Sequence, residues 1–484
     1  MGFYQITEEL VNQAFTTNGD RAFKSTGSFC LDYFSIVGGM RYNLNDALTL
    51  FLKSYYEDPI LTIKILFYIR DIKNGLGERN LFRGAFNMLS NMKPEVAKQL
   101  ITYIPLYGRY DDLLVCLETP LKGDVLKYIK DQIKEDIENK KNDKPISLLA
   151  KWLPSINTSS DEARRLAKIV SKGLEMSHEE YRRTLSFLRK GMIIENDIRE
   201  KKYDFEYAHI PGGAMFKYRK AFIRNDEKRY LEYIEAVKTG NTKMNTKNLY
   251  PYEIIRTLQD ETSLEEREIL DTMWNNFDRS IISSKTIVVR DGSGSMYCGG
   301  AIPPIAVATS LAILFAEQLT GEFKNKFITF SSRPQIVEIK GETIYDKYNY
   351  LRMYNDISNT NIKAVYDLIL RTYKSPQFQK EDALDRIVII SDMQFDALPA
   401  TSLSTFEYFK KQFETLGYKM PEIVFWNVYA SSIQFPTVNE KNVKLVGGAS
   451  NRIIDDIIKS HDTTPYEFMI ECLERYSFVN ELKI

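Results

Sequence analysis

The most constraining feature of the sequence is a short apolar run that leads directly into a loop of small polar residues. Thr286-Ile287-Val288-Val289 has the character of a buried strand. Asp291-Gly292-Ser293-Gly294-Ser295 follows after a single residue. The two glycines allow a tight turn, so the carboxylate and both hydroxyls can point toward one place. The stretch therefore predicts a ligand-binding loop at the carboxyl end of a strand.

Strand-like and helical segments alternate from about residue 280 onward. The predicted strands are 286–290, 327–330, 336–339, 387–390, 423–426 and 443–446, and the predicted helices are 303–319, 361–374, 403–416, 450–458 and 464–475. This alternation predicts a doubly wound α/β domain with a mainly parallel sheet. The short run 336–339 is expected to pair with 327–330 across a turn.

Residues from about 40 to 280 have mostly helical spacing, with short turns and no clear strand. Stacked helical pairs of HEAT type, in a ring or an arc, are one solution for such a chain. No fixed repeat period is found. We therefore predict a multidomain protein with a helical repeat domain at 1–280 and an α/β domain at 281–484.

Composition limits the class of protein. The formal net charge is zero, so the whole molecule is not a polybasic nucleic-acid coat. The four cysteines are far apart and form no CxxC pair, which favours neither a zinc site nor a disulfide framework and fits a reducing compartment. Neither a secretory signal nor a long apolar span is found, so we expect a cytoplasmic protein without a membrane partner.

Two later residues are expected at the same edge of the sheet as the polar loop. Asp392 follows the strand at 387–390, and Thr360 stands just before the helix at 361–374. Hard oxygen donors gathered at one point suit Mg²⁺ or another divalent cation. The predicted metal ligands are Asp291, Ser293, Ser295, Thr360 and Asp392. The alternative is a serine-rich turn whose hydroxyls cap the next helix.

This constellation resembles the metal-ion-dependent adhesion site of von Willebrand factor A domains. The resemblance implies that Ser293, Ser295 and Thr360 coordinate the ion directly, whereas Asp291 and Asp392 act mainly through bound water. It also implies that a carboxylate of a protein partner, or another anion, fills the last coordination position. Arg290 departs from the pattern, because an apolar residue usually precedes the motif aspartate, and this charge could alter access to the site.

The helical part carries a second resemblance. Gly75-Leu76-Gly77-Glu78-Arg79, Phe82-Arg83 and Gly108-Arg109-Tyr110-Asp111-Asp112-Leu113-Leu114 resemble the TROVE module of Ro proteins. They are closer still to a TROVE-related family that ends in an A domain, which Leu148-Leu149-Ala150-Lys151-Trp152-Leu153-Pro154-Ser155 also fits. The resemblance covers residues 40–450 and implies a ring that binds small noncoding or single-stranded RNA.

Basic residues are concentrated in the middle of the sequence. Residues 151–250 contain 21 Lys and Arg against 14 Asp and Glu, with aromatic residues between them. Cations neutralise phosphates and aromatic faces stack on unpaired bases, although solvated helix faces and core aromatics are the alternative. The candidate RNA-binding residues are Arg164, Arg165, Arg182, Arg183, Arg189, Lys190, Lys217, Tyr218, Arg219, Lys220 and Arg224.

Two main functions remain open from the sequence. A weaker third is a phosphoryl-transfer enzyme or nuclease that uses the bound ion, for which no additional base or clustered carboxylates are identified near Asp291. The leading hypothesis is a non-enzymatic, Ro-like RNA-binding scaffold that carries a metal-ion-dependent adhesion site. The alternative is a metal-dependent protein-interaction module without RNA binding, in which the ion binds an acidic residue of a partner.

Asp111 and Asp112 near Glu78 and Arg79 could form a catalytic acid cluster, but an ion pair network that holds helix turns together is favoured.

Overall fold

The computed structural model describes residues 12–15, 21–247, 249–279, 282–298, 300–355, 361–394 and 405–484. Contacts within the chain divide it into two compact units. The first, here called the sheet unit, contains Met1–Glu57 and Glu206–Arg475. The second, here called the helical unit, contains Asp58–Phe205 and Tyr476–Ile484. This grouping differs from the predicted division at residue 280, because residues on both sides of 280 pack in the sheet unit.

A six-stranded mixed sheet forms the centre of the sheet unit, with the strand order β5-β4-β3-β6-β7-β8. Its strands are β3 (Thr286–Asp291), β4 (Lys326–Phe330), β5 (Ile336–Glu338), β6 (Arg386–Ser391), β7 (Glu422–Asn427) and β8 (Val443–Gly447). Neighbouring strands are parallel except β4 and β5, which are antiparallel. Each predicted strand after residue 280 is therefore present, and so is the predicted hairpin.

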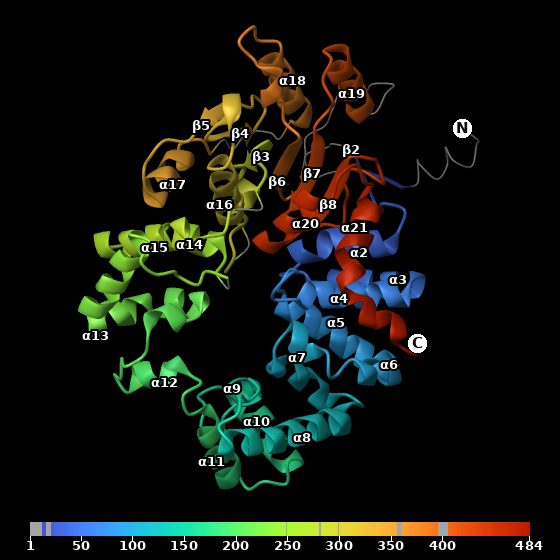
Figure 1. Cartoon of the computed structure of the whole chain (residues 1–484). Helices are drawn as coiled ribbons and strands as arrows, with labels where there is room; N and C mark the ends of the chain where they lie inside the picture. Colours follow the sequence, from blue (N-terminus) through green and yellow to red (C-terminus); the bar gives the residue numbers. More distant parts are fainter. Residues whose placement is uncertain are drawn as a thin grey trace. The chain divides into compact units, whose positions relative to one another are not determined.

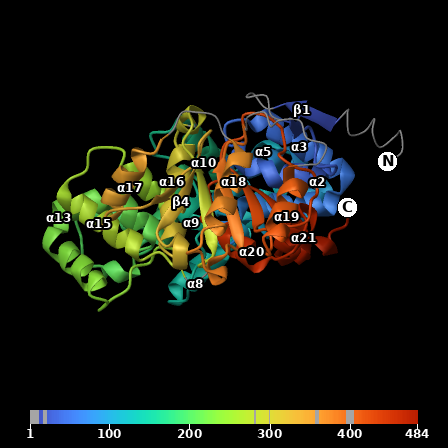
Figure 2. The ribbon, with the colours of Figure 1, turned by 90° about the horizontal axis from the view of Figure 1, so that it is seen from above.

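Helices cover both faces of this sheet. Alternate residues such as Ile287 and Val289 belong to an apolar core with α18 (Ile362–Tyr373) and α19 (Thr405–Thr415). On the other face Arg290 contacts Thr309 of α16 (Pro304–Ala316), a helix in which every residue is buried. Figure 2 shows α16 and α18 on opposite sides of the strands.

Three helices of the sheet unit come from residues before the alternating region, and a fourth beside them comes from within it. The helices α13 (Gly212–Lys238), α14 (Pro251–Thr257), α15 (Leu264–Asn275) and α17 (Ile344–Arg352) lie together next to α16 (Figure 2). α13 has a kink at Asp226, where the backbone leaves the helical region. The helix α17 was missing from the predicted elements.

The N-terminal part of the chain completes the sheet unit. It contains β1 (Gln13–Phe15), β2 (Arg21–Phe23), α2 (Phe29–Ile36), η1 (Val37–Gly39) and α3 (Leu44–Glu57). α2 packs against β8, and a Cβ atom at Gly38 would lie 2.3 Å from the carbonyl oxygen of Gly447. Only glycine fits there, because the two backbones are in direct contact.

The helical unit consists of short helices in sequence (Figure 1). They are α4 (Pro59–Arg70), α5 (Arg79–Met92), α6 (Pro94–Gln99), α7 (Ile104–Tyr107), η2 (Tyr110–Glu118), α8 (Lys122–Lys141), α9 (Leu149–Trp152), α10 (Asp161–Gly173), α11 (His178–Arg189) and α12 (Ile194–Arg199). Asp58 caps α4, with its side chain accepting from the amide of Leu61. The helical character predicted for this region is confirmed, although the segment at 111–118 is a 3₁₀ helix.

The last described residues of the chain return to the helical unit. Phe478 stacks on Tyr103, with ring centroids 4.1 Å apart, and on Tyr107 at 5.4 Å. The hydroxyl of Tyr476 donates to Asp71 over 3.1 Å. This segment therefore supplies part of the core of helices that lie far upstream in the sequence.

The remaining elements are η3 (Tyr207–His209), η4 (Gly294–Tyr297), η5 (Gly321–Phe323), η6 (Lys380–Asp382), η7 (Asn451–Ile453), α20 (Ile454–Lys459), α21 (Pro465–Leu473) and η8 (Glu474–Glu481). Across the described part of the chain, every helix is too short or too polar to cross a bilayer. All four cysteines are free, as expected, and only Cys298 is exposed.

Candidate metal centre

The candidate metal site lies where the connections of the sheet change direction. β3 has β4 as its neighbour on one side and β6 on the other, and all three are parallel. The connection that leaves β3 runs to β4 on one side of β3, whereas the connection that enters β6 comes from β5 and crosses to the other side. Such a switch point opens a crevice beyond the carboxyl ends of the strands. Asp291 ends β3, and Asp392 comes directly after β6.

Asp291 is fully buried and accepts hydrogen bonds with both carboxylate oxygens. The hydroxyl of Ser391 donates to Oδ2 over 2.7 Å, and the amide of Ser293 donates to Oδ1 over 2.8 Å. The register of the sheet explains the first contact, because Arg290 pairs with Ile390 and so brings the next residues together. The carboxylate is thus held rigidly from both strands.

Asp392 lies beside the serine loop. It is 3% exposed, and the amide of Gln394 donates to its Oδ1 over 3.2 Å. Burial raises the pKa of Asp392, while a hydrogen bond from the Ser295 side chain opposes this rise. The hydroxyls of Ser293 and Ser295 are 3.1 Å apart. Two carboxylates and two hydroxyls from separate strands therefore converge.

The electrostatics of the two carboxylates, Asp291 and Asp392, favour a bound cation. Burial, and then the nearby charge of Asp392, raise the pKa of Asp291 to about 6. Two desolvated carboxylates of like charge repel one another when both are ionised. A divalent ion would neutralise both, and hard oxygen donors of this kind suit Mg²⁺.

The backbone after Asp392 is strained. Met393 has a φ of 63°, in the left-handed region that side chains with a Cβ rarely adopt. Its amide donates to the Ser391 hydroxyl over 3.0 Å, which helps to hold this conformation. Strain that the surroundings maintain in this way often occurs where a side chain must be aimed at a site.

Sequence reasoning placed Asp291, Ser293, Ser295 and Asp392 together, and the structure brings these residues into one cluster. Thr360 lies outside the described residues. Ser391 was not predicted, although it ends β6 and directly precedes Asp392, which is a signal for a supporting role. Among the described residues, no group of three His, Cys, Asp or Glu side chains forms a metal cluster of another kind.

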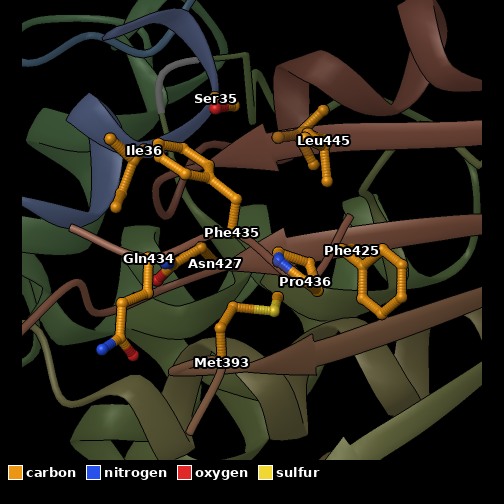
Figure 3. Close-up of a pocket in the computed structure, with 10 residues that line it drawn as sticks. Ser35, Ile36, Met393, Phe425, Asn427, Gln434, Phe435, Pro436 and Leu445 are labelled. Carbon is orange, nitrogen blue, oxygen red and sulfur yellow. The ribbon is translucent and has the colours of Figure 1, made fainter. Parts of the chain in front are cut away.

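A small cavity lies near the same ends of the strands. Figure 3 shows its lining, which includes Met393, Phe425, Asn427, Phe435 and Leu445. Its volume is about 10 Å³, which is at the lower limit for one water molecule. It is therefore a packing defect between mostly apolar side chains and not a ligand site.

The candidate RNA-binding residues fall in both compact units. Arg164, Arg165, Arg182, Arg183, Arg189 and Lys190 belong to the helical unit, and Lys217, Tyr218, Arg219, Lys220 and Arg224 lie on α13 of the sheet unit.

Several of these cations already have acidic partners. Arg165 pairs with Glu118 and Glu162, Arg164 with Asp161, and Arg183 with Glu179. Arg219 is 8% exposed and lies 2.7 Å from Glu266, which Lys220 also approaches at 3.3 Å. Arg219 is therefore part of the interior and not of an exposed basic surface, and Phe222 is likewise a core residue.

Arg189 has a structural role as well. Its guanidinium donates to the carbonyl oxygens of Ala150 and Leu153 over 2.8 and 2.6 Å and to the hydroxyl of Ser155 over 2.6 Å. These bonds tie α11 to the segment after α9. Arg182 and Lys190, in contrast, are exposed and line a cavity of about 480 Å³ in the helical unit.

The acidic cluster of the helical unit is a structural ion network. Asp112 is fully buried, with its carboxylate 2.7 Å from Nε of both Arg70 and Arg83. The amide of Arg109 donates to the same carboxylate over 2.9 Å. A Cβ atom at Gly108 would lie 2.6 Å from Asp112 Oδ2, so a glycine is needed beside it. The favoured interpretation of this motif is thus confirmed.

Comparison with known proteins gives a family. Residues 285–471 match a domain of unknown function, DUF7788, and residues 16–104 and 123–284 match a second, DUF2828. The two matches meet close to the division predicted at residue 280. "Uncharacterized protein L728" of Acanthamoeba polyphaga mimivirus is 27% identical over 511 residues, which is 96% of this chain and 88% of the relative.

Among solved structures, the RO (RSR) protein of Deinococcus radiodurans is similar to 92% of this chain and 96% of its own, with 10% identity and a TM-score of 0.37. The DUF2828 match covers more than half of the 484 residues. The chain therefore belongs to the family described as domain of unknown function DUF2828.

Proposed function

We propose that this protein is a non-enzymatic binding scaffold whose sheet unit holds a divalent cation, Mg²⁺ or a similar ion. The observation that carries the proposal is the pair of buried carboxylates, Asp291 and Asp392, beside the hydroxyls of Ser293 and Ser295. Thr360 is the further ligand that the sequence predicts.

The burial of the site residues favours an ion that binds a partner molecule. The two carboxylates are buried, whereas Ser293 is partly exposed and Ser295 is exposed. An ion held by these groups therefore has a coordination position open to solvent on the side of Ser293 and Ser295. A carboxylate from a protein partner is the chemistry that fits such an open position, because Mg²⁺ prefers oxygen ligands.

Selection of displayed peptides on the full chain tests this proposal. Peptides bound in the presence of Mg²⁺ and eluted with EDTA are expected to be enriched in Asp or Glu, since the ion requires a carboxylate. Asp291→Asn serves as the matched bait and is expected to retain few of them. EDTA-eluted peptides without any acidic residue, or equal retention by both baits, would contradict the proposal.

RNA binding by the helical unit is the second candidate. The cavity of about 480 Å³ is lined by Arg182, Arg189, Lys190, Arg199 and Lys202, against the two acidic residues Asp197 and Glu200. Lys202 pairs with Glu200, whereas Arg182 and Lys190 are exposed, so the lining keeps an excess of cations. The motif resemblance to Ro proteins points to the same ligand class.

Filter binding of single-stranded and structured RNA at several salt concentrations tests the second candidate. The double variant Arg182→Glu, Lys190→Glu is expected to lower affinity by about 10-fold and to reduce the salt dependence, because two phosphate contacts are lost. Lys168→Glu is the matched control, as Lys168 is exposed on α10 of the same unit and lies outside the cavity lining. Equal affinities for the wild type and the double variant would argue against this surface.

A further inference from the structure

Arg290 is a buried cation in a central strand of the sheet. It is 1% exposed, and among the described residues no carboxylate lies within ion pair distance of it. Burial lowers its pKa to about 10, so the guanidinium is still charged at neutral pH. A buried charge without an ionic partner is costly unless polar groups surround it.

Neutral acceptors surround most of this guanidinium. Nη1 donates to the hydroxyl of Thr309 over 3.1 Å. Nη2 donates to the carbonyl oxygens of Leu351 and Tyr354 over 3.3 and 3.0 Å and to Oδ1 of Asn355 over 2.8 Å. Nε is buried and has no hydrogen-bond partner within the described part of the chain. Arg290 thus holds the end of α17, but its charge is not neutralised and its donors are not all used.

A cavity of about 390 Å³ lies beside this side chain, within the sheet unit. The residues that line it are Gln259, Arg290, Tyr297, Pro303, Ile305, Thr309, Tyr348, Arg352 and Asn355. Arg352 supplies a second guanidinium, and among the described residues that line the cavity there is no Asp or Glu. Two guanidinium groups without a carboxylate make an anion the favoured occupant, because arginine binds phosphate and carboxylate oxygens in a forked geometry.

The remaining lining suits an organic ligand. Tyr297 and Tyr348 present aromatic rings, Pro303 and Ile305 present apolar surface, and Gln259 and Asn355 carry amides that can donate and accept. The volume falls within the range of roughly 300–1,000 Å³ that is usual for small-molecule sites. Inorganic phosphate alone would leave most of this space and the aromatic surface unused.

We propose that this cavity binds a small phosphate monoester with a planar ring system, of which a nucleoside monophosphate is the representative class. Arg290 and Arg352 contact the phosphate, and Tyr297 and Tyr348 contact the ring. This site is separate from the carboxylate cluster of Asp291 and Asp392, so it does not require a bound cation.

Calorimetric titration of the full chain with adenosine monophosphate, adenosine and inorganic phosphate tests this proposal. Adenosine monophosphate is expected to bind with a Kd below about 1 mM, phosphate more weakly, and adenosine most weakly of all, since the phosphate supplies the ionic contacts. Arg352→Gln is expected to lower the affinity for adenosine monophosphate about 10-fold through loss of a charge-assisted contact. The result is expected to be the same with EDTA as with Mg²⁺.

Arg333→Gln is the matched control, because Arg333 is exposed between β4 and β5 and lies outside the cavity lining. Arg290→Lys keeps the charge but loses the fork, and it is expected to weaken binding if its melting curve shows a folded protein. If that variant does not fold, the affinities of Arg352→Gln and Arg333→Gln for adenosine monophosphate test the proposal instead. Absence of binding up to about 10 mM, equal binding of adenosine, or an unchanged affinity in Arg352→Gln would overturn the proposal.

Discussion

Replacing Asp112 with alanine is expected to destabilise the helical unit by roughly 3–5 kcal/mol, because it breaks a buried ion pair. The carboxylate neutralises Arg70, which is 2% exposed, and it also accepts from Arg83. Without it, the buried guanidinium of Arg70 has no ionic partner. Hydrogen exchange of residues 59–118, compared between variant and wild type, measures this effect within the helical unit.

Asp111→Ala is the matched control for that experiment. Asp111 is 17% exposed and pairs with Arg83 and Arg109 closer to the surface. Its removal is expected to cost about 1 kcal/mol or less, because solvent replaces much of the lost interaction. Equal protection from hydrogen exchange in both variants would contradict the prediction that loss of the buried Asp112 is more destabilising than loss of Asp111.

Replacing Asp291 with asparagine is expected to weaken Mg²⁺ binding by about 10- to 100-fold, the magnitude typical of losing an outer-shell partner. The same change removes a desolvated charge whose pKa lies near 6. The ion-free variant is therefore expected to melt at the same temperature as the ion-free wild type, or at a higher one, near neutral pH. Thermal unfolding with and without Mg²⁺ measures both effects.

Glu338→Gln is the control for charge removal, since Glu338 is exposed on the edge strand β5. It is expected to leave the response to Mg²⁺ unchanged. An Asp291→Asn protein that Mg²⁺ stabilises as strongly as the wild type would contradict the proposed metal centre.

The carboxyl group of Asp291 also makes the folding stability of the wild-type protein depend on pH. Its pKa in the folded, ion-free protein is about 6, above the usual 3.8, so the folded state binds more protons than the unfolded state between these values. Folding stability contributed by this group therefore falls as the pH rises toward 6. Mg²⁺ competes with the proton, so its stabilising effect is expected to be larger near pH 7.5 than near pH 5.

Local sequence patterns predicted the strands of the α/β region and the proximity of Asp291 and Asp392, whereas metal binding stays a prediction. The apolar runs at 286–290 and 387–390 are strands whose ends meet, because parallel strands present their carboxyl ends at one edge. That rule predicts from the sequence alone that Asp291 and Asp392 lie close together.

Long-range packing was not accessible in the same way. α2 packs against β8, and nothing in the residues 29–36 indicates a partner so far along the chain. Charge counting along the sequence also does not show which cations are paired, because Arg219 and Arg165 each pair with a glutamate 47 positions away. Arg290 was recognised as a departure from the adhesion-site pattern, but its role depends on the end of α17, which was not predicted.

The contact of Tyr476 with Asp71 spans 405 positions of the sequence. During synthesis at about 5–20 residues per second, the ribosome needs roughly 20–80 s to travel from one residue to the other. Throughout that interval Tyr103 and Tyr107 lack the aromatic ring of Phe478 that later stacks on them. The apolar surface of Tyr103 and Tyr107 is consequently incomplete until Phe478 has been synthesised, and exposed apolar surface of this kind favours aggregation.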